Sequence, residues 1–472
     1  MKRLVFVALL VALVALPAAA AEFTLGGYIK LDAWWDSTQV SKNLLGVVVR
    51  HNDYQAFGGT SNRNHHGRFQ ATAQSSRFNF TIKGPELWGA KTSGFIEVDF
   101  DQQLDTRQTS SHSYVPRLRH AFFRLDWPET QLLMGQYWGM FCNYYPELIQ
   151  DGPFQGHGQS TQRLAQVRLT QKFLGMFTLA GLVGTPYDPD STDNIGGTMS
   201  PTGTVALWGQ RSATPQFQIS LDFEKDFYGK AAFYGRPKGF NINVAAGWQR
   251  TQYLKGRAAA SAYTFGNNNY VGAFNIIQRD DQYLDPWVVQ VTAFIPVIPT
   301  RTPNLAGTAS LTAQFYVGAG LSAFGMARDQ DNSYFVYRGN HFWTDPTNGN
   351  LFFGPVYERV LHKAYGGYIQ AQYYFNNQWY LTYAYGFQKL FDVNNSTCVG
   401  APGGYFYATM QDQALMTQEH AIALYYRPIT ALKFGLQYSY MRTDYLQITT
   451  VGSRTTRMGD NHRVEFAGWF YF

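Results

Sequence analysis

The last eleven residues of the chain, His462–Phe472, alternate between two kinds of side chain. The apolar face carries Val464, Phe466, Gly468, Phe470 and Phe472, and the opposite face carries Arg463, Glu465, Ala467, Trp469 and Tyr471. A period of two predicts a β-strand with an unbroken apolar face, at a chain end where soluble proteins usually fray. That face must be covered by a second sheet or by lipid, and a final aromatic ring suits a membrane–water interface.

The N-terminus has the three parts of a secretory signal peptide. Met1–Arg3 is basic, Leu4–Leu16 is apolar, and Pro17–Ala21 is a run of small residues before Glu22. We therefore predict a signal peptide over residues 1–21 and export of residues 22–472. No other window of the sequence offers the roughly 20 apolar residues that a transmembrane helix requires.

The alternation of the C-terminal strand recurs along the mature chain, for example in Arg77–Lys83, Gln216–Glu224 and Leu432–Tyr440. Aromatic residues make up 17% of the chain and charged residues 15%, whereas soluble domains carry about a quarter charged residues. No linker or charge run divides the sequence, so we predict one domain over residues 22–472. Its strands are expected to be apolar on one face only, as in an outer-membrane barrel.

The connections separate a barrel from a β-sandwich, which would also alternate but has edges to protect. Short turns such as Gly84–Gly89 and Leu174–Gly175 alternate with long polar segments at 37–67, 103–116, 139–165, 184–214, 253–283, 323–360, 390–413 and 446–459. This asymmetry predicts an all-β fold, a transmembrane antiparallel β-barrel of about 16 strands with long extracellular loops and short periplasmic turns. Pro and Gly residues in 225–252 and 284–307 leave this count uncertain by about two strands.

The register of the strand around Arg117–Arg124 stays open from sequence alone. A bulge in this strand would direct both Arg119 and Arg124 into the barrel. A regular strand would place these two residues, five positions apart, on opposite faces.

Five short motifs occur in order along the first third of the chain: Gly26–Ala33, Ser76–Phe78, Leu118–Phe122, Gly135–Trp138 and Gln166–Gln171. Together they resemble the DcaP-like porins, within the class of trimeric bacterial porins. The resemblance implies a 16-stranded homotrimer that passes small, preferentially anionic solutes such as dicarboxylates. The first predicted strand begins almost at the cleavage site, so the helical N-terminal extension of some members is absent from this pattern.

The third long segment, 139–165, is the candidate constriction loop of a porin. It is aromatic and carries Glu147 and Asp151, which is unusual for a loop that faces only solvent, and we expect it to fold inward. The basic residues expected to face it across the lumen are Arg77, Arg119, Arg124, Arg163, Arg168 and Lys172. Opposed charges would set up a transverse field, and the basic excess would favour anions. Alternatively, these cations pair with Glu97, Asp99, Asp126 or Glu465 and only solvate the wall.

These features predict a porin that allows passive diffusion of small hydrophilic solutes and favours anions such as carboxylates. The alternative is a scaffold barrel that sheathes a partner or presents its surface loops. We expect outer-membrane lipid and the barrel-assembly machinery, acting on the terminal Phe472, as partners. Two further copies of the chain are partners that the resemblance implies. No Ser–His–acid motif indicates an enzyme, and we expect no cofactor or metal. The formal charge of +6 is too mild and too scattered to indicate nucleic-acid binding.

The two cysteines, Cys142 and Cys398, both fall in long connections of an exported chain. A disulfide that ties one loop to another and two unpaired thiols are equally compatible with the sequence.

Overall fold

The computed structural model describes residues 21–38, 40, 48–49, 67–101, 114–186, 212–258, 276–326, 333–344, 351–392, 405–406, 414–445 and 458–472. Residues 1–20 of the predicted signal peptide and the second cysteine, Cys398, lie outside the described residues. No helix in the described ranges is long and apolar enough to cross a membrane.

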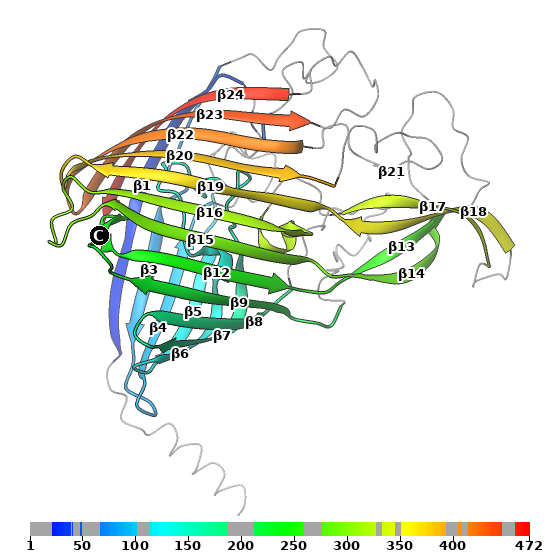
Figure 1. Cartoon of the computed structure of the whole chain (residues 1–472), viewed down its shortest axis with the longest axis horizontal. Coiled ribbons are helices and arrows are strands. Elements are labelled where there is room, and N and C mark those ends of the chain that lie inside the picture. Colours follow the sequence, from blue (N-terminus) through cyan, green and yellow to red (C-terminus); the bar gives the residue numbers. More distant parts are fainter. Residues whose placement is uncertain are drawn as a thin grey trace, which may run out of the picture.

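Sixteen antiparallel strands form a closed barrel, which confirms the predicted fold and strand count (Figure 1). They are β1 (Glu22–Asp36), β2 (Arg68–Thr72) together with β3 (Arg77–Lys83), β4 (Lys91–Asp99), β5 (Arg117–Asp126), β6 (Thr130–Trp138), β7 (Arg163–Phe173), β8 (Phe177–Gly184), β9 (Gln216–Lys225), β12 (Phe240–Trp248), β15 (Trp287–Ile298), β16 (Ala309–Ala319), β19 (Lys363–Tyr374), β20 (Trp379–Leu390), β22 (Ala414–Ile429), β23 (Leu432–Tyr445) and β24 (Met458–Tyr471). β2 and β3 count as one because both pair with β1, at its C-terminal and N-terminal halves respectively.

The barrel closes between its first and last strands. β1 pairs with β24 from Tyr28 opposite Tyr471 to Asp36 opposite Arg463. Closure satisfies the backbone N–H and C=O groups of both terminal strands, which hydrocarbon cannot do. The C-terminal strand is therefore held at both edges, by β1 and by β23.

The two faces of β24 lie as the alternation predicts. Phe466 and Phe470 are 43% and 48% exposed on the outer surface, whereas Arg463 and Glu465 are completely buried on the inner side. Exposed apolar side chains follow the outward positions of the other barrel strands in the same way. The outer surface therefore suits lipid, and the polar residues line the lumen.

A bulge in β5 resolves the register that the sequence leaves open. The β4–β5 pairing shifts between Glu97 and Val98, so Arg119 is an extra residue with no partner position on β4. Arg119 and His120 are consequently both buried on the inner side, while Leu118 and Phe123 are exposed on the outer face. Arg119 and Arg124 thus both lie on the lumen side of the same strand.

Further elements lie in the connections. β13 (Thr251–Ala258), β14 (Ile276–Leu284), β17 (Ser333–Thr344), β18 (Leu351–Leu361) and β21 (Tyr405–Phe406) form a separate sheet at the long-loop end of the barrel (Figure 1). β10 (Ala231–Phe233) and β11 (Arg236–Lys238) form a short hairpin in the β9–β12 connection. Two single-turn 3-10 helices, η2 (Met140–Cys142) and η4 (Leu321–Phe324), follow β6 and β16. The fifth and sixth long segments, expected as loops, thus contain paired strands.

Candidate pore constriction

The connection between β6 and β7, residues 139–162, runs across the interior of the barrel, and we call it the pore loop. Its backbone is held by amide side chains of strands around the barrel wall. The donors and acceptors are Gln218 of β9, Gln290 of β15, Gln314 of β16, Gln370 of β19 and Gln437 of β23, at N···O distances of 2.5–3.2 Å. Lys30 of β1 donates to the Ile149 carbonyl at 2.7 Å. The loop is therefore fastened to strands from both ends of the sequence.

Small residues on the inner wall make room for the apolar side of the pore loop. A Cβ at Gly435 would lie 2.8 Å from Ile149 Cδ1, and one at Gly386 would lie 2.3 Å from the His157 carbonyl oxygen. Ile149, Phe141 and Phe154 are buried, and the Phe141 ring packs edge-on against Phe324 at 5.7 Å. The aromatic composition of the segment is thus explained by its burial inside the barrel.

Glu147 of the pore loop is held by three groups of the wall. Its carboxylate contacts Lys433 Nζ at 2.9 Å and accepts hydrogen bonds from Tyr380 Oη at 2.6 Å and Gln372 Nε2 at 2.9 Å. Burial raises the pKa of Glu147, but the charge of Lys433 and these hydrogen bonds outweigh it, and the pKa lies below its ordinary value. Glu147 therefore stays ionised and helps to hold the loop in place.

Asp151, four residues further along the loop, forms an ion pair with Arg77 of β3 at 2.9 Å. Burial raises the pKa of Asp151, but nearby positive charges outweigh this effect and lower the pKa to about 2. These charges belong to Arg77, Arg119, Lys30 and Arg117. The second carboxylate of the loop is therefore charged across the whole physiological pH range.

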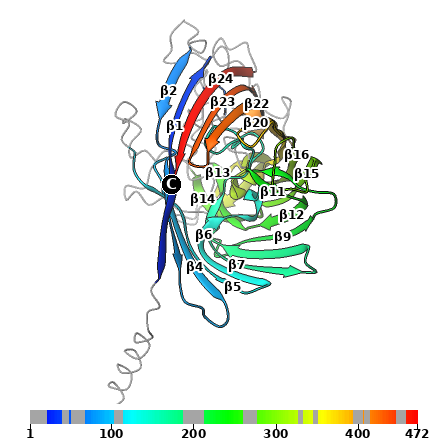
Figure 2. The ribbon, with the colours of Figure 1, turned by 90° about the vertical axis from the view of Figure 1, so that its left-hand side faces the viewer.

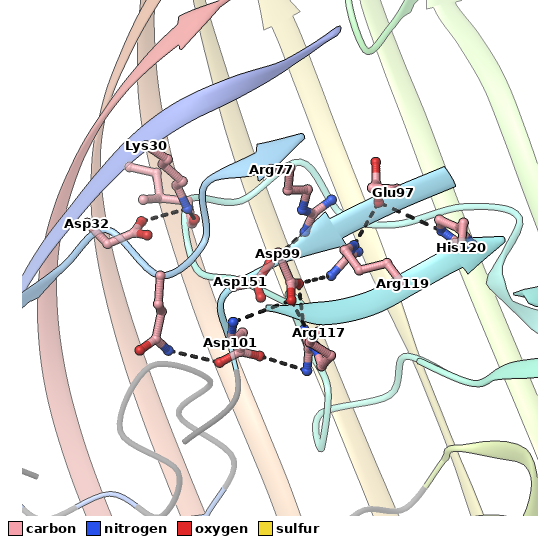
Figure 3. Close-up of polar contacts among 12 residues, drawn as sticks. Lys30, Asp32, Arg77, Glu97, Asp99, Asp101, Arg117, Arg119, His120 and Asp151 are labelled. Carbon is pink, nitrogen blue, oxygen red and sulfur yellow. Dashed lines mark hydrogen bonds and ion pairs between the residues drawn. The ribbon is translucent and has the colours of Figure 1, made fainter. Parts of the chain in front are cut away.

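Four arginines of the facing wall, Arg77, Arg117, Arg119 and Arg163, form what we call the arginine cluster. Arg117 contacts Asp99 at 2.6 Å and Asp101 at 3.0 Å, and Arg119 contacts Glu97 at 2.7 Å and Asp99 at 2.5 Å. Figure 3 shows Arg77, Arg117 and Arg119 pointing toward Glu97, Asp99, Asp101 and Asp151. The position of β5 residues beside Asp99 follows from the bulge, which brings Arg119 inward.

Arg163 differs from the other members of the arginine cluster. Its guanidinium lies over the Trp138 ring at 5.0 Å. Among the described residues it has no carboxylate partner, and its buried Nη1 has no hydrogen-bond acceptor. Within the described part of the chain, one guanidinium of the cluster therefore has no direct ion-pair partner.

A cavity of about 400 Å³ lies between the pore loop and the arginine cluster. The cationic residues that line it are Lys30, Arg77, Arg117, Arg119, Arg163 and Lys433, and the carboxylates are Asp101, Glu147 and Asp151. A second cavity of about 430 Å³ adjoins it towards the periplasmic turns, and both cavities are lined by Glu147, Tyr234, Lys433 and Tyr471. The two cavities therefore lie next to each other in the lumen, with these four residues at their shared boundary.

Three of the predicted basic residues do not line either cavity. Arg124 pairs with Asp126 at 3.2 Å, and Arg168 lies over the Tyr137 ring at 5.3 Å and donates to the Trp138 carbonyl. Lys172 is exposed near the β7–β8 turn. Of the predicted positions, the structure thus gathers Arg77, Arg119, Glu147, Asp151 and Arg163 around the first cavity.

Sequence reasoning missed Arg117, Lys30, Lys433 and the glutamines that fasten the pore loop. The alternation does mark some of them as inward-facing. The residues on the polar face of an alternating strand are Lys30, Lys433, Gln218 and Gln437. Alternation alone does not say which inward residues lie at the same height in the barrel.

Cys142 is buried in the pore loop rather than displayed on an outward loop. Its Sγ lies 3.4 Å from Ser160 Oγ, and burial raises the pKa of its thiol. Because Cys398 lies outside the described residues, the disulfide between the two stays a prediction.

The closed 16-stranded barrel, with a loop folded into its lumen, defines the fold of the bacterial outer-membrane porins. No protein-family model matches the sequence, and no curated protein matches it. Among solved structures, the chain is similar to the outer membrane channel DcaP of Acinetobacter baumannii, with a TM-score of 0.58, 18% identity and coverage of 96% of this chain and 98% of that chain. The resemblance predicted from the sequence motifs is confirmed at the level of the fold.

Two other outer-membrane proteins are similar to this chain at lower TM-scores. OprB of Pseudomonas putida has 8% identity and a TM-score of 0.49, with coverage of 96% of this chain and 94% of that chain. OmpF of Salmonella typhi has 12% identity and a TM-score of 0.47, with coverage of 95% and 97% respectively.

Proposed function

We propose that this protein is an outer-membrane porin through which small hydrophilic solutes diffuse passively, and that it favours anions such as carboxylates. The observation that carries the proposal is the lining of the cavity beside the pore loop, where six cationic side chains face three carboxylates. An excess of one sign of charge in a narrow, low-dielectric passage raises the local concentration of solutes of the opposite sign.

The distribution of the ion pairs supports an anion preference. Glu147 and Asp151 each have a cationic partner at 2.9 Å, whereas Arg163 has none among the described residues. Guanidinium groups bind carboxylate and phosphate oxygens through paired N–H donors. A passing anion would therefore find an unpaired guanidinium in the passage, while a passing cation would find carboxylates that are already neutralised.

The proposal includes the setting of the pore. The apolar outer surface supports insertion of the barrel in outer-membrane lipid. The barrel-assembly machinery recognises Phe472 during this insertion. By the resemblance stated above, the functional unit is a homotrimer. The similar DcaP protein is itself described as an outer membrane channel, which supports a channel role for this chain.

The reversal potential of the purified, refolded protein in planar bilayers tests this function. Under a salt gradient we expect stable ion conductance and a potential whose sign shows anion selectivity. A cation-selective pore would contradict the role of the arginine cluster. A folded protein that inserts without passing current would contradict the porin function and favour the scaffold alternative.

A further inference from the structure

The periplasmic connection between β9 and β12 does not turn directly from one strand to the next. Its hairpin, β10–β11, enters the barrel, where Figure 2 shows β11 inside the ring of strands. Ala231 and Ala232 are buried, and the Ala232 carbonyl accepts a hydrogen bond from Ser310 Oγ on the inner face of β16 at 3.1 Å. The Phe233 ring packs against Phe294 of β15 at 5.4 Å. We call this element the periplasmic hairpin.

The periplasmic hairpin meets the pore loop inside the lumen. Tyr234 Oη donates a hydrogen bond to the Tyr145 carbonyl, and the rings of Phe233 and Tyr144 pack edge-on at 5.2 Å. Lys238 Nζ lies 5.5 Å from the centre of the Tyr144 ring and pairs with Glu224 at 2.8 Å. Two segments that enter from opposite ends of the barrel therefore share one contact surface.

Tyr234 stands at a position of the hairpin where turn chemistry disfavours a tyrosine. Phe233 pairs with Arg236, and the two residues between them have φ values of 49° for Tyr234 and 72° for Gly235. A two-residue turn with positive φ at both positions prefers Asn, Asp or Gly at the first of them. A large side chain kept in a strained backbone conformation points to a role for that side chain.

A second turn of the barrel has the same geometry and an ordinary explanation. Leu87 pairs with Ala90, and Trp88 and Gly89 have φ values of 51° and 73°. Trp88 is 79% exposed and lines neither lumen cavity, as expected for an aromatic residue at the membrane interface. Tyr234 lies inside the barrel, so this explanation does not apply to it.

The two lumen cavities both reach the tip of the periplasmic hairpin. Tyr234 is 41% exposed and lines both cavities, together with Glu147, Lys433 and Tyr471. We propose that Tyr234 is a size-limiting residue of the pore, placed on the periplasmic side of the pore loop by the inward-folded hairpin. This inference rests on the proposed porin function and adds a second narrowing to the one made by the pore loop.

The Tyr234→Asn variant tests the proposal without straining the turn, because Asn is preferred at this position. Loss of the ring should raise single-channel conductance by roughly twofold, since the current through a narrow pore follows its open cross-section. In liposome swelling, sugars too large for the native pore should then enter. The matched control is Trp88→Asn, the same kind of change in the same kind of turn, which should leave both measurements as they are in the native protein.

A cysteine at the same position gives a second, independent measurement. In Tyr234→Cys, attachment of a bulky methanethiosulfonate reagent should lower the open-channel current in steps, while the native chain treated in the same way should keep its current. If folded Tyr234→Asn has the conductance and sugar cut-off of the native pore, and the modified cysteine leaves the current unchanged, Tyr234 does not limit the passage. A native protein that passes no current would instead overturn the porin function itself.

Discussion

At the scale of single residues, the charged side chains around the first cavity differ in how completely they are paired with an opposite charge. Asp99 contacts two arginines and Asp151 contacts Arg77, whereas Arg163 lies over the Trp138 ring and has no direct carboxylate contact among the described residues. A charge that is already paired contributes little to the field felt by a solute. The unpaired Arg163 should therefore contribute more to anion selectivity than its paired neighbours.

Arg163→Ala should lower the anion-to-cation permeability ratio. A unit charge about 4 Å from a solute in water is worth about 1 kcal/mol, which corresponds to a decrease of up to about fivefold. The measurement is the reversal potential under a salt gradient. Arg124→Ala is the control, because Arg124 pairs with Asp126 away from both cavities. Equal effects of the two substitutions would show that position in the lumen does not matter.

Acidification should strengthen anion selectivity through Asp101. Burial and the charge of Asp151 raise the pKa of Asp101 to about 6, although Arg117 acts against them. As the pH falls from about 7 to about 5, Asp101 gains a proton and Arg117 loses one partner, whereas Asp151, with a pKa of about 2, stays charged. Because the pKa of Asp101 is raised on folding, its contribution to stability is largest at low pH and is lost as the pH rises through about 6.

Reversal potentials measured across this pH range test the assignment to Asp101. The Asp101→Asn variant should show at neutral pH the anion selectivity that the native pore reaches at about pH 5. Its selectivity should then not change between these two pH values. A step that persists in Asp101→Asn would assign the titration to another group.

At the scale of elements, the pore loop depends on a wall that offers amide side chains and gaps of matching shape. Gln437 accepts the Ile149 N–H at 2.7 Å, and Gly435 leaves the space that the Ile149 side chain fills. The pore loop is therefore packed tightly against the inner wall of the barrel. Its position should be sensitive to the volume of wall residues that lie beneath it.

Gly435→Val should displace the pore loop. The new side chain would begin 2.8 Å from Ile149 Cδ1 and 3.0 Å from Tyr425 Cε1, and overpacking of this kind costs roughly 1 to 3 kcal/mol. The expected result is a noisier open-channel current in planar bilayers. Gly181→Val is the matched control, since a Cβ at Gly181 on the outer face of β8 meets nothing within 4 Å. A quiet current in Gly435→Val would show that the loop adapts without moving into the passage.

At the scale of the whole molecule, the barrel is stabilised by the contrast between its two surfaces. Phe466 faces outward from the middle of β24, and the buried Arg463 and Glu465 face the lumen on the same strand. Closure through β1 makes this contrast continuous around the ring. A charge on the outer face should therefore destabilise the barrel according to its depth in the bilayer.

Phe466→Arg should lower the free energy of unfolding by about 2 to 4 kcal/mol if Phe466 lies near the bilayer midplane. Phe472→Arg, at the periplasmic end of the chain, should cost only about 0 to 1 kcal/mol. Urea unfolding of protein refolded into lipid vesicles measures both values. Equal costs at the two positions would contradict the depth expected from the order of residues in β24.

The sequence by itself determined most of the barrel strands, their two faces and the order of long and short connections. These follow from a period of two, which most barrel strands display within their own few residues. It also singled out the pore loop by its aromatic residues and its two carboxylates, Glu147 and Asp151. Each of these features is local, so neighbouring residues are enough to reveal it.

The tertiary structure alone decided which lumen residues meet. It selected Arg117 and Lys433 for the cavity lining, placed Arg124 and Arg168 outside it, and brought the periplasmic hairpin to the pore loop. The stagger of strands around a closed barrel sets the height of each inward side chain, and the bulge at Arg119 changes the inward face of β5. Contacts across the lumen join residues that are far apart in sequence. A local sequence pattern does not specify which of these distant residues meet.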